Sequence, residues 1–420
     1  MGIFLVAIAV RVAMGIALGA FNVPPNGEMT AVAESIAATS VFGNPNRVPS
    51  GPTAHVAPVY PYLLAGLLKA TGPVSFRPFV TTLNIVVASL LWAALPRVVV
   101  DLSLSRRSGL LAGIFGALNP INHWVELNGY WESTLSALCL LGLVGFTFRR
   151  RTTWTRPSHA AAIGAIWGLA VLLQPAVVTV FVVLLALVAR TTWSRPATIR
   201  AATIAMMTLL LVVLPWTIRN YRTFGGFMFV RGNLGIELSV SNNDGALPTH
   251  ENVLRNPQAR HPHVSAVEFA KRNSIGELAY DRSRLKDAIT WIRAHPARFA
   301  SLTIQRVRLF WVRQRSWTVF SLLEWTTTAL AWFGLGTLLW KRAEVGWWIL
   351  GIWTVYPLMY YVVQVDERYR YPIEWTLVLS AAAGMCHITP VGSERLRYWK
   401  VTRAELAPKE PSAGTDSLDN

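Results

Sequence analysis

Two carboxylates stand in the first polar segment of the chain, residues 22–72. Glu28 and Glu34 lie in a short stretch with helical character, between the hydrophobic run 3–21 and a turn rich in Pro and Gly. They are six residues apart, about 240° around a helix, so a regular helix cannot direct both toward one site. Glu28 is nearer to the end of the hydrophobic run. We therefore expect Glu28 to be the acid that does chemistry, by accepting a proton or by orienting a reacting hydroxyl.

Helix capping is the alternative explanation for these acids. Asn26 is a suitable N-cap for a helix that starts at Gly27, which places Glu28 in the first turn, where a carboxylate complements the helix dipole. Glu132 stands at the head of a later hydrophobic segment, and capping and catalysis explain it equally well. Glu126, a few residues earlier, is expected to be a solvated loop acid.

Arginines in the polar segments supply a complementary chemistry. A guanidinium pairs with phosphate through two parallel hydrogen bonds, so a lipid phosphate or pyrophosphate is the expected partner. Pairing with Asp366 or Glu367 and anchoring at a membrane interface are the alternatives. The candidates are Arg219, Arg222, Arg368 and Arg370.

Most of the remaining chain is apolar. Of its 420 residues, 53% are hydrophobic and 15% are charged, and the mean hydropathy is +0.38. A soluble domain carries about 25% charged residues, so the composition indicates an integral membrane protein. The net charge of +17 comes from short basic clusters between apolar segments, without any nucleic-acid-binding motif, and we exclude nucleic acid as a partner. Cys139 and Cys386 form neither a disulfide framework nor a metal pattern.

The hydrophobic segments predict an all-α polytopic membrane protein with about ten transmembrane helices. The run 57–72 is too short and too rich in Pro and Tyr for a span, and we expect an interfacial helix in the first outer loop. The first segment lacks a basic n-region and a cleavage site, so it is expected to be a retained span. The expected spans are 2–21, 79–97, 108–121, 133–149, 159–173, 175–190, 199–217, 319–340, 345–363 and 372–388.

Basic residues predict the orientation, because Lys and Arg favour cytoplasmic loops. With 57–72 outside, clusters such as Arg149-Arg150-Arg151 fall in alternate loops, which places both termini in the cytoplasm and the site on the outer face of the cell membrane. In the long polar insertion, a helical pattern from Ala279 to Leu309 is interrupted at His295-Pro296. The predicted units are an N-terminal bundle 1–217 with the first outer loop 22–78, a small α-rich outer domain 218–318, C-terminal membrane helices 319–388 and a partly disordered cytoplasmic tail 389–420.

Two further predictions concern buried charge and metal. Arg11 lies within a span, so it must face protein or water, and we expect it to pair with an acid from another span or loop. The histidines show no compact metal-ligand spacing. A divalent metal is compatible with the sequence but not indicated by it, and no cofactor is expected. The histidines considered are His55, His123, His261 and His263.

Several stretches together resemble the GT-C superfamily of polytopic membrane glycosyltransferases, which includes the protein O-mannosyltransferases and the lipid A aminoarabinose transferase. The resemblance covers nearly the whole chain. It implies a GT-C-like helical bundle that uses a polyprenyl-phosphate-linked sugar. The stretches are Gly27-Glu28-Met29, Gly51-Pro52-Thr53-Ala54, Ala57-Pro58-Val59-Tyr60-Pro61, Pro215-Trp216-Thr217-Ile218-Arg219-Asn220-Tyr221, Asn233-Leu234-Gly235-Ile236-Glu237-Leu238 and Arg368-Tyr369-Arg370-Tyr371-Pro372.

The resemblance also implies roles for individual residues. The first-loop acid of this group acts as the base, which points to Glu28, with Glu132 assisting an inverting transfer. Many relatives carry an Asp-Glu pair where this chain has Glu28-Met29. The acceptor would be a hydroxyl of a protein, a glycolipid or a polysaccharide. The expected ligands of the donor and its lipid phosphate are His55, Tyr60, Arg219, Arg222, Arg368, Tyr369 and Arg370.

A membrane transporter or lipid flippase for envelope precursors is the main alternative function. It would account for the spans, the cationic residues and Arg11. Transporters, however, tend to show internal repeats and broken helices at the membrane midplane, and the sequence shows no repeat. A scaffold in an envelope-polymer assembly fits the acid-bearing first loop poorly. The sequence therefore favours a transferase.

Overall fold

The structure is a computed structural model that describes residues 1–23, 27–190, 194–250, 261–313 and 318–388. The predicted all-α class is confirmed, because these residues form helices and, within the described ranges, only two isolated bridges, Gly43 with Pro52 and Thr249 with Val365. Asn26 and the tail 389–420 lie outside the described residues. The helices are α1 (Gly2–Ala17), α2 (Glu28–Thr39), α3 (Val59–Asp101), α4 (Arg106–Leu118), α5 (His123–Leu127), α6 (Ser133–Arg150), α7 (Pro157–Leu173), α8 (Val177–Ala189), α9 (Arg195–Phe224), α10 (Leu234–Ser241), α12 (Ala266–Ile275), α13 (Glu277–Ala294), α14 (Pro296–Trp311), α15 (Thr318–Trp340), α16 (Glu344–Val355), α17 (Leu358–Val362) and α18 (Glu367–Ile388).

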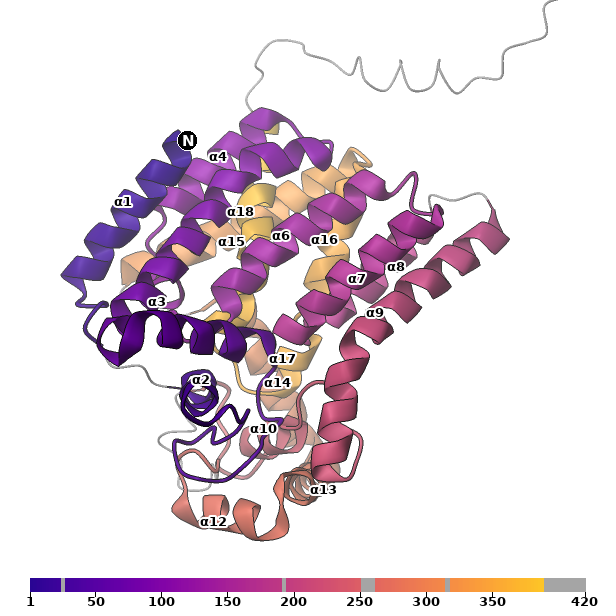
Figure 1. Ribbon diagram of the computed structural model, residues 1–420. Helices are drawn as coiled ribbons and strands as arrows, with labels where there is room; N and C mark the ends of the chain where they lie inside the picture. The colour runs from indigo at the N-terminus through magenta and orange to yellow at the C-terminus, as the bar shows by residue number, and fades with distance from the viewer. Residues whose placement is uncertain (24–26, 191–193, 251–260, 314–317, 389–420) are drawn as a thin grey trace, which may run out of the picture.

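The helices form a bundle, and a smaller group of helices gathers at one end of it (Figure 1). In the bundle, α7 packs along α9, α15 along α18 and α3 along α4. The smaller group consists of α2, α10, α12 and α13, and the chain starts at the opposite end of the bundle (Figure 1). The predicted helix break at His295-Pro296 is confirmed, since α13 ends at Ala294 and α14 begins at Pro296.

Helix α3 consists of two helical segments. Gly72 has φ 71° and ψ 165°, a conformation that favours glycine and ends a helix, and Pro73 follows it. The segment 59–71 therefore turns away from the rest of α3 and lies across the end of the bundle (Figure 1). This break separates the run that we predicted to be interfacial from the predicted span 79–97. Its placement at a membrane surface stays a prediction.

Among the described residues, two helices, α3 and α9, are long and apolar enough to cross a membrane. Helices α1, α7 and α8 are apolar but shorter, and the 17 residues of α7 rise only about 26 Å, against about 30 Å of hydrocarbon core. The count of about ten spans is therefore not confirmed, and the orientation stays a prediction. The span predicted at 345–363 is wrong as a single helix. Pro357 cannot donate a backbone hydrogen bond, and α16 ends at Val355 before α17 begins at Leu358.

A separate apolar core positions α2 at the end of the bundle. Met29, Val32 and Ile36 follow helical spacing and form one buried face of α2. This face packs with Tyr60 and Leu64 from the first segment of α3. The core therefore fixes the first turn of α2, where Glu28 stands.

A buried ion pair ties α1 to α5 inside the bundle. Nη2 of Arg11 lies 2.8 Å from Oε1 of Glu126, and both side chains are almost fully buried. Trp92 Nε1 and the Tyr371 hydroxyl donate to the same oxygen, at 3.0 and 2.7 Å. The prediction that Arg11 pairs with a distant acid is confirmed. The expectation that Glu126 is a solvated loop acid is wrong, because α5 directs its carboxylate into the bundle toward this cation.

We expect Glu126→Ala to lower the free energy of unfolding by about 3–5 kcal/mol, because it leaves the Arg11 charge buried without its partner. Reversible denaturation of the purified protein in mixed micelles measures this change. Glu34→Ala is the matched control. It removes the acid of an exposed pair with Arg47, which is worth about 0–1 kcal/mol. Equal losses in the two variants would contradict the prediction.

Candidate active site

A cavity of about 360 Å³ opens between α2, α6, α8, α10 and α17. Its walls carry charges of both signs: three carboxyl groups and two guanidinium groups. The carboxyl groups come from the start of α2, from the residue before α6 and from α10. The charged lining residues are Glu28, Glu132, Glu237, Arg231 and Arg368. A cavity of this size with few charged groups fits a small-molecule or cofactor site.

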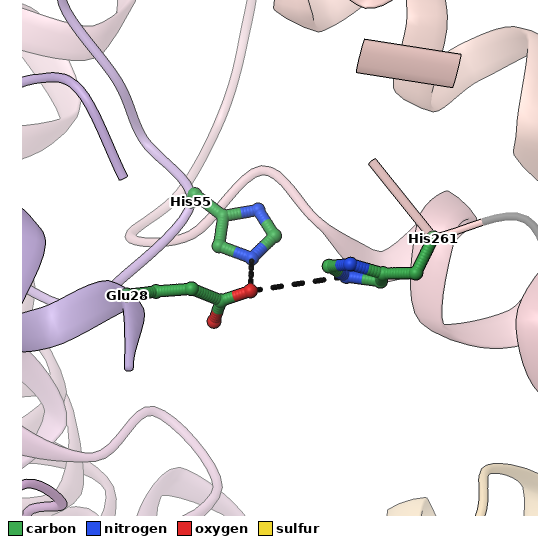
Figure 2. A group of neighbouring side chains, drawn as sticks. All are labelled: Glu28, His55 and His261. Carbon is green, nitrogen blue, oxygen red and sulfur yellow. Dashed lines mark ion pairs between the residues drawn. The ribbon is translucent and has the colours of Figure 1, made fainter. Parts of the chain in front are cut away.

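Glu28 begins α2, and Gly27 takes the N-cap position with φ 126°, a value that favours glycine. Oε1 of Glu28 lies 3.0 Å from Nε2 of His55 and 3.9 Å from Nε2 of His261 (Figure 2). Burial would raise the pKa of Glu28, but His55, and with it His261 and His263, outweigh this effect and hold the pKa well below its usual range. Glu28 is therefore an ionised carboxylate at neutral pH.

Glu132 occupies the N-cap position of α6, but its side chain makes no capping hydrogen bond. Its carboxyl group instead lines the cavity and is almost fully buried. Burial raises the pKa of Glu132, against the opposing pull of Arg231 and Arg368. The two carboxyl groups thus have pKa values shifted in opposite directions, a pattern that marks acid and base roles in known active sites.

Arg368, which the sequence predicted to bind the lipid phosphate, lies in the cavity wall. Its guanidinium carbon is 3.6 Å from the ring centroid of Trp131, and its Nε is 3.8 Å from the carboxylate of Asp366. Arg231 lines the same cavity and donates from Nε to the backbone oxygen of His55 at 3.0 Å. Sequence reasoning missed Arg231. The neighbouring motif Asn233-Leu234-Gly235-Ile236-Glu237-Leu238, which also contributes Glu237, was the available signal.

Two arginines that were predicted to bind the lipid phosphate instead contact other groups of the protein. Arg370 is buried, with its guanidinium 2.8 Å from Glu374 and 3.0 Å from Glu324, so it neutralises acids inside the bundle. Arg219 donates to the backbone oxygens of Thr53 and Phe42, at 2.7 and 3.1 Å. Both predictions are corrected: these groups hold the fold together and do not line the cavity.

The remaining predicted ligands are divided in the same way. Tyr369 lines the cavity, and its ring stacks on Tyr360 with 4.5 Å between centroids. The Tyr60 hydroxyl donates to the backbone oxygen of Gly129 at 2.6 Å and faces the apolar core of α2, so its predicted role is corrected. Arg222 is exposed in the last turn of α9 and is not among the lining residues.

The loop that carries His55 is anchored to α13. Glu277 accepts hydrogen bonds from the Thr53 hydroxyl and from the backbone N–H of Ala54, both at 2.8 Å. Arg272, at the end of α12, pairs with the same carboxylate. All four groups are buried. His55 is therefore held in place by helices that follow it in sequence by more than 200 residues.

One ligand atom each from Glu28, His55 and His261 lies within 4.8 Å of the others, a spacing that could suit a metal ion. The hydrogen bonds do not fit one. The backbone N–H of His263 donates to Nδ1 of His261 at 3.0 Å, so the proton of the neutral ring is on Nε2, where the ligand lone pair would have to be. A histidine that ligates a metal through Nε2 usually donates its Nδ1–H to an acceptor, and Nδ1 of His55 has no partner among the described residues.

Comparisons with known proteins rest on structure alone, because no family model and no curated protein match this sequence. Solved structures of the oligosaccharyltransferase AglB from Archaeoglobus fulgidus are similar at 13% identity. The complex with an inhibitory peptide and a dolichol-phosphate has a TM-score of 0.54 over 96% of this chain and 53% of that chain. The complex with Zn and sulfate has a TM-score of 0.55 over 92% and 49%. This chain thus spans about half the length of these neighbours.

The likeness covers the bundle and the helices at its end together, since it includes nearly all of this chain. At this identity it establishes the fold and leaves substrates and chemistry to be argued from the site. The likeness in fold agrees with the resemblance drawn from the sequence motifs: this chain shares the fold of these solved oligosaccharyltransferase structures.

Proposed function

We propose that this protein is a membrane glycosyltransferase that moves a sugar from a polyprenyl-phosphate donor to an acceptor hydroxyl, with inversion at the anomeric carbon. The transfer takes place at the outer face of the membrane. The observation that carries the proposal is the grouping of Glu28, Glu132, Arg231 and Arg368 around one cavity. Glycosyl transfer from a lipid phosphate needs both kinds of group, an acid to handle the acceptor proton and cations to receive the phosphate.

The reaction is a single displacement. Glu28 accepts the proton of the acceptor hydroxyl, or orients that hydroxyl, as the oxygen forms a bond to the anomeric carbon. The bond between that carbon and the phosphate oxygen breaks, and the phosphate leaves with the bonding electrons. Arg368 and Arg231 stabilise its developing charge. Glu132 lines the same cavity as both guanidinium groups and assists in positioning the donor.

The structural neighbours support the choice of a lipid-linked donor. One was solved with a dolichol-phosphate and an inhibitory peptide, and another is tethered to an acceptor peptide that contains an NVT sequon. We extend to this chain the polyprenyl-phosphate carrier and an acceptor that brings a hydroxyl group. A transporter is less favoured, because these neighbours in fold are transferases.

We expect Glu28→Gln to lower the turnover of sugar transfer by about 100-fold or more, the range typical for loss of a general base. The assay uses the full chain in nanodiscs with radiolabelled polyprenyl-phosphate sugars and crude envelope acceptors. Glu34→Gln is the matched control, because Glu34 lies on the same helix but pairs with Arg47 at the surface. Near-normal turnover in Glu28→Gln would exclude Glu28 as the base.

We expect Arg368→Ala and Arg231→Ala each to lower the turnover by about 100- to 1,000-fold, as loss of a group that stabilises developing charge does. Arg293→Ala removes an exposed arginine of α13 and should transfer sugar like the wild type. Stopped time courses of label transfer measure all three variants. If both cavity arginines were dispensable, the leaving phosphate would have to be bound elsewhere.

A further inference from the structure

His261 presents an N–H group toward Glu28. The backbone N–H of His263 occupies the lone pair of Nδ1, so in the neutral ring the proton is on Nε2. Its Nε2 lies 3.9 Å from Oε1 of Glu28, beyond hydrogen-bond distance, and Figure 2 shows the ring edge directed at the carboxylate. The residue is buried, which disfavours a charged ring. The geometry therefore makes His261 a neutral donor that faces an anion.

His55 approaches the same oxygen from the other side. Its Nε2 is 3.0 Å from Oε1 of Glu28, although the N–H does not point straight at the oxygen. The two imidazole rings are nearly perpendicular, with centroids 5.8 Å apart. The backbone of His55 is fixed by Arg231 on one side and by the Thr53 hydroxyl on the other. Oε1 thus faces two imidazole nitrogens, while the cavity gives access to the carboxylate.

We propose that His55 and His261 are positioning residues that hold the Glu28 carboxylate between two Nε2–H groups, and that this cluster works without a metal ion. The inference rests on the proposed function, in which Glu28 handles the acceptor proton. The two Nε2 atoms stand against Oε1 at 3.0 and 3.9 Å, which restricts the rotamer of Glu28 and leaves Oε2 for the acceptor hydroxyl. They also favour the ionised form, the only form that accepts a proton.

The proposal has a consequence for pH dependence. Burial lowers the pKa of His261 to about 4, so its ring stays neutral at pH 7, while the pKa of Glu28 is held well below its usual range. Loss of a donor raises the pKa of Glu28, so the acidic limb of the activity profile moves to higher pH. Other titratable or charged groups also face Glu28 and His261. They are His250, His263, Glu237 and, across the cavity, Glu132, Arg231 and Arg368.

The test compares His261→Gln, which keeps an N–H near the Nε2 position, with His261→Asn, whose shorter amide cannot reach it. We expect the Gln variant to keep turnover within about threefold of the wild type, and the Asn variant to lose about 10-fold, the value of a weak polar contact to the carboxylate. The acidic limb should move to higher pH only in the Asn variant. Equal losses in the two variants would overturn the proposal.

A second experiment tests whether the two histidines act on Glu28 or bind a metal ion. Wild-type protein dialysed against EDTA should keep its activity, and added Zn²⁺ or Mn²⁺ should not raise it. Activity lost to EDTA and restored by either ion would overturn the proposal while leaving the transferase function intact.

A third readout does not depend on activity. NMR of protein labelled with ¹⁵N-histidine, with the His261→Gln variant for assignment, should show that Nε2 of His261 carries the proton and Nδ1 does not. The opposite tautomer would overturn the inference, even if no sugar donor had been identified.

Discussion

The buried carboxylate of Glu277 links the two halves of the site. It receives the Thr53 hydroxyl and the Ala54 N–H from the first loop, and it pairs with Arg272 at the end of α12. These partners offset the desolvation of the buried carboxylate, and loss of Arg272 would leave its charge buried without a counter-charge. Through this group the loop with His55 and the helices that follow His261 are fixed relative to each other. The position of Glu28 between the two histidines depends on that link.

Two of the three carboxyl groups of the cavity differ in their surroundings. Glu28 has two histidines beside it, whereas Glu132 is buried in the cavity wall with arginines nearby. The pKa of the first group is lowered and that of the second is raised. One ionised acid next to one that ionises less readily is a workable arrangement for a reaction in which a proton is removed while an anion departs. The arginines supply a fixed positive field for that anion without any reorganisation of the protein.

Two neighbouring arginines of the sequence have different surroundings in the structure. Arg368 and Arg370 are two residues apart at the start of α18, so they point about 200° apart on the helix. Arg368 faces Trp131 and the cavity, whereas Arg370 turns into the bundle toward Glu324 and Glu374. The first turn of α18 therefore provides one group for the site and one for the fold. Arg11 and Glu126 also serve the fold, because their buried ion pair fixes how two segments far apart in sequence pack.

Composition, local periodicity and the cost of an unpaired charge indicated a membrane protein and predicted the helical class, the acid at the start of α2 and the need of Arg11 for a partner. The sequence also indicated Arg368 through its position in a polar loop. Only the tertiary structure decided that Glu126 is that partner, that Arg231 and not Arg219 or Arg370 lines the cavity, and that His55 and His261 meet at Glu28. His55 and His261 are some 200 residues apart, and neither has a local pattern that distinguishes it from a loop histidine. Their encounter follows from the packing of α2, α3, α12 and α13, which no short-range signal in the sequence encodes.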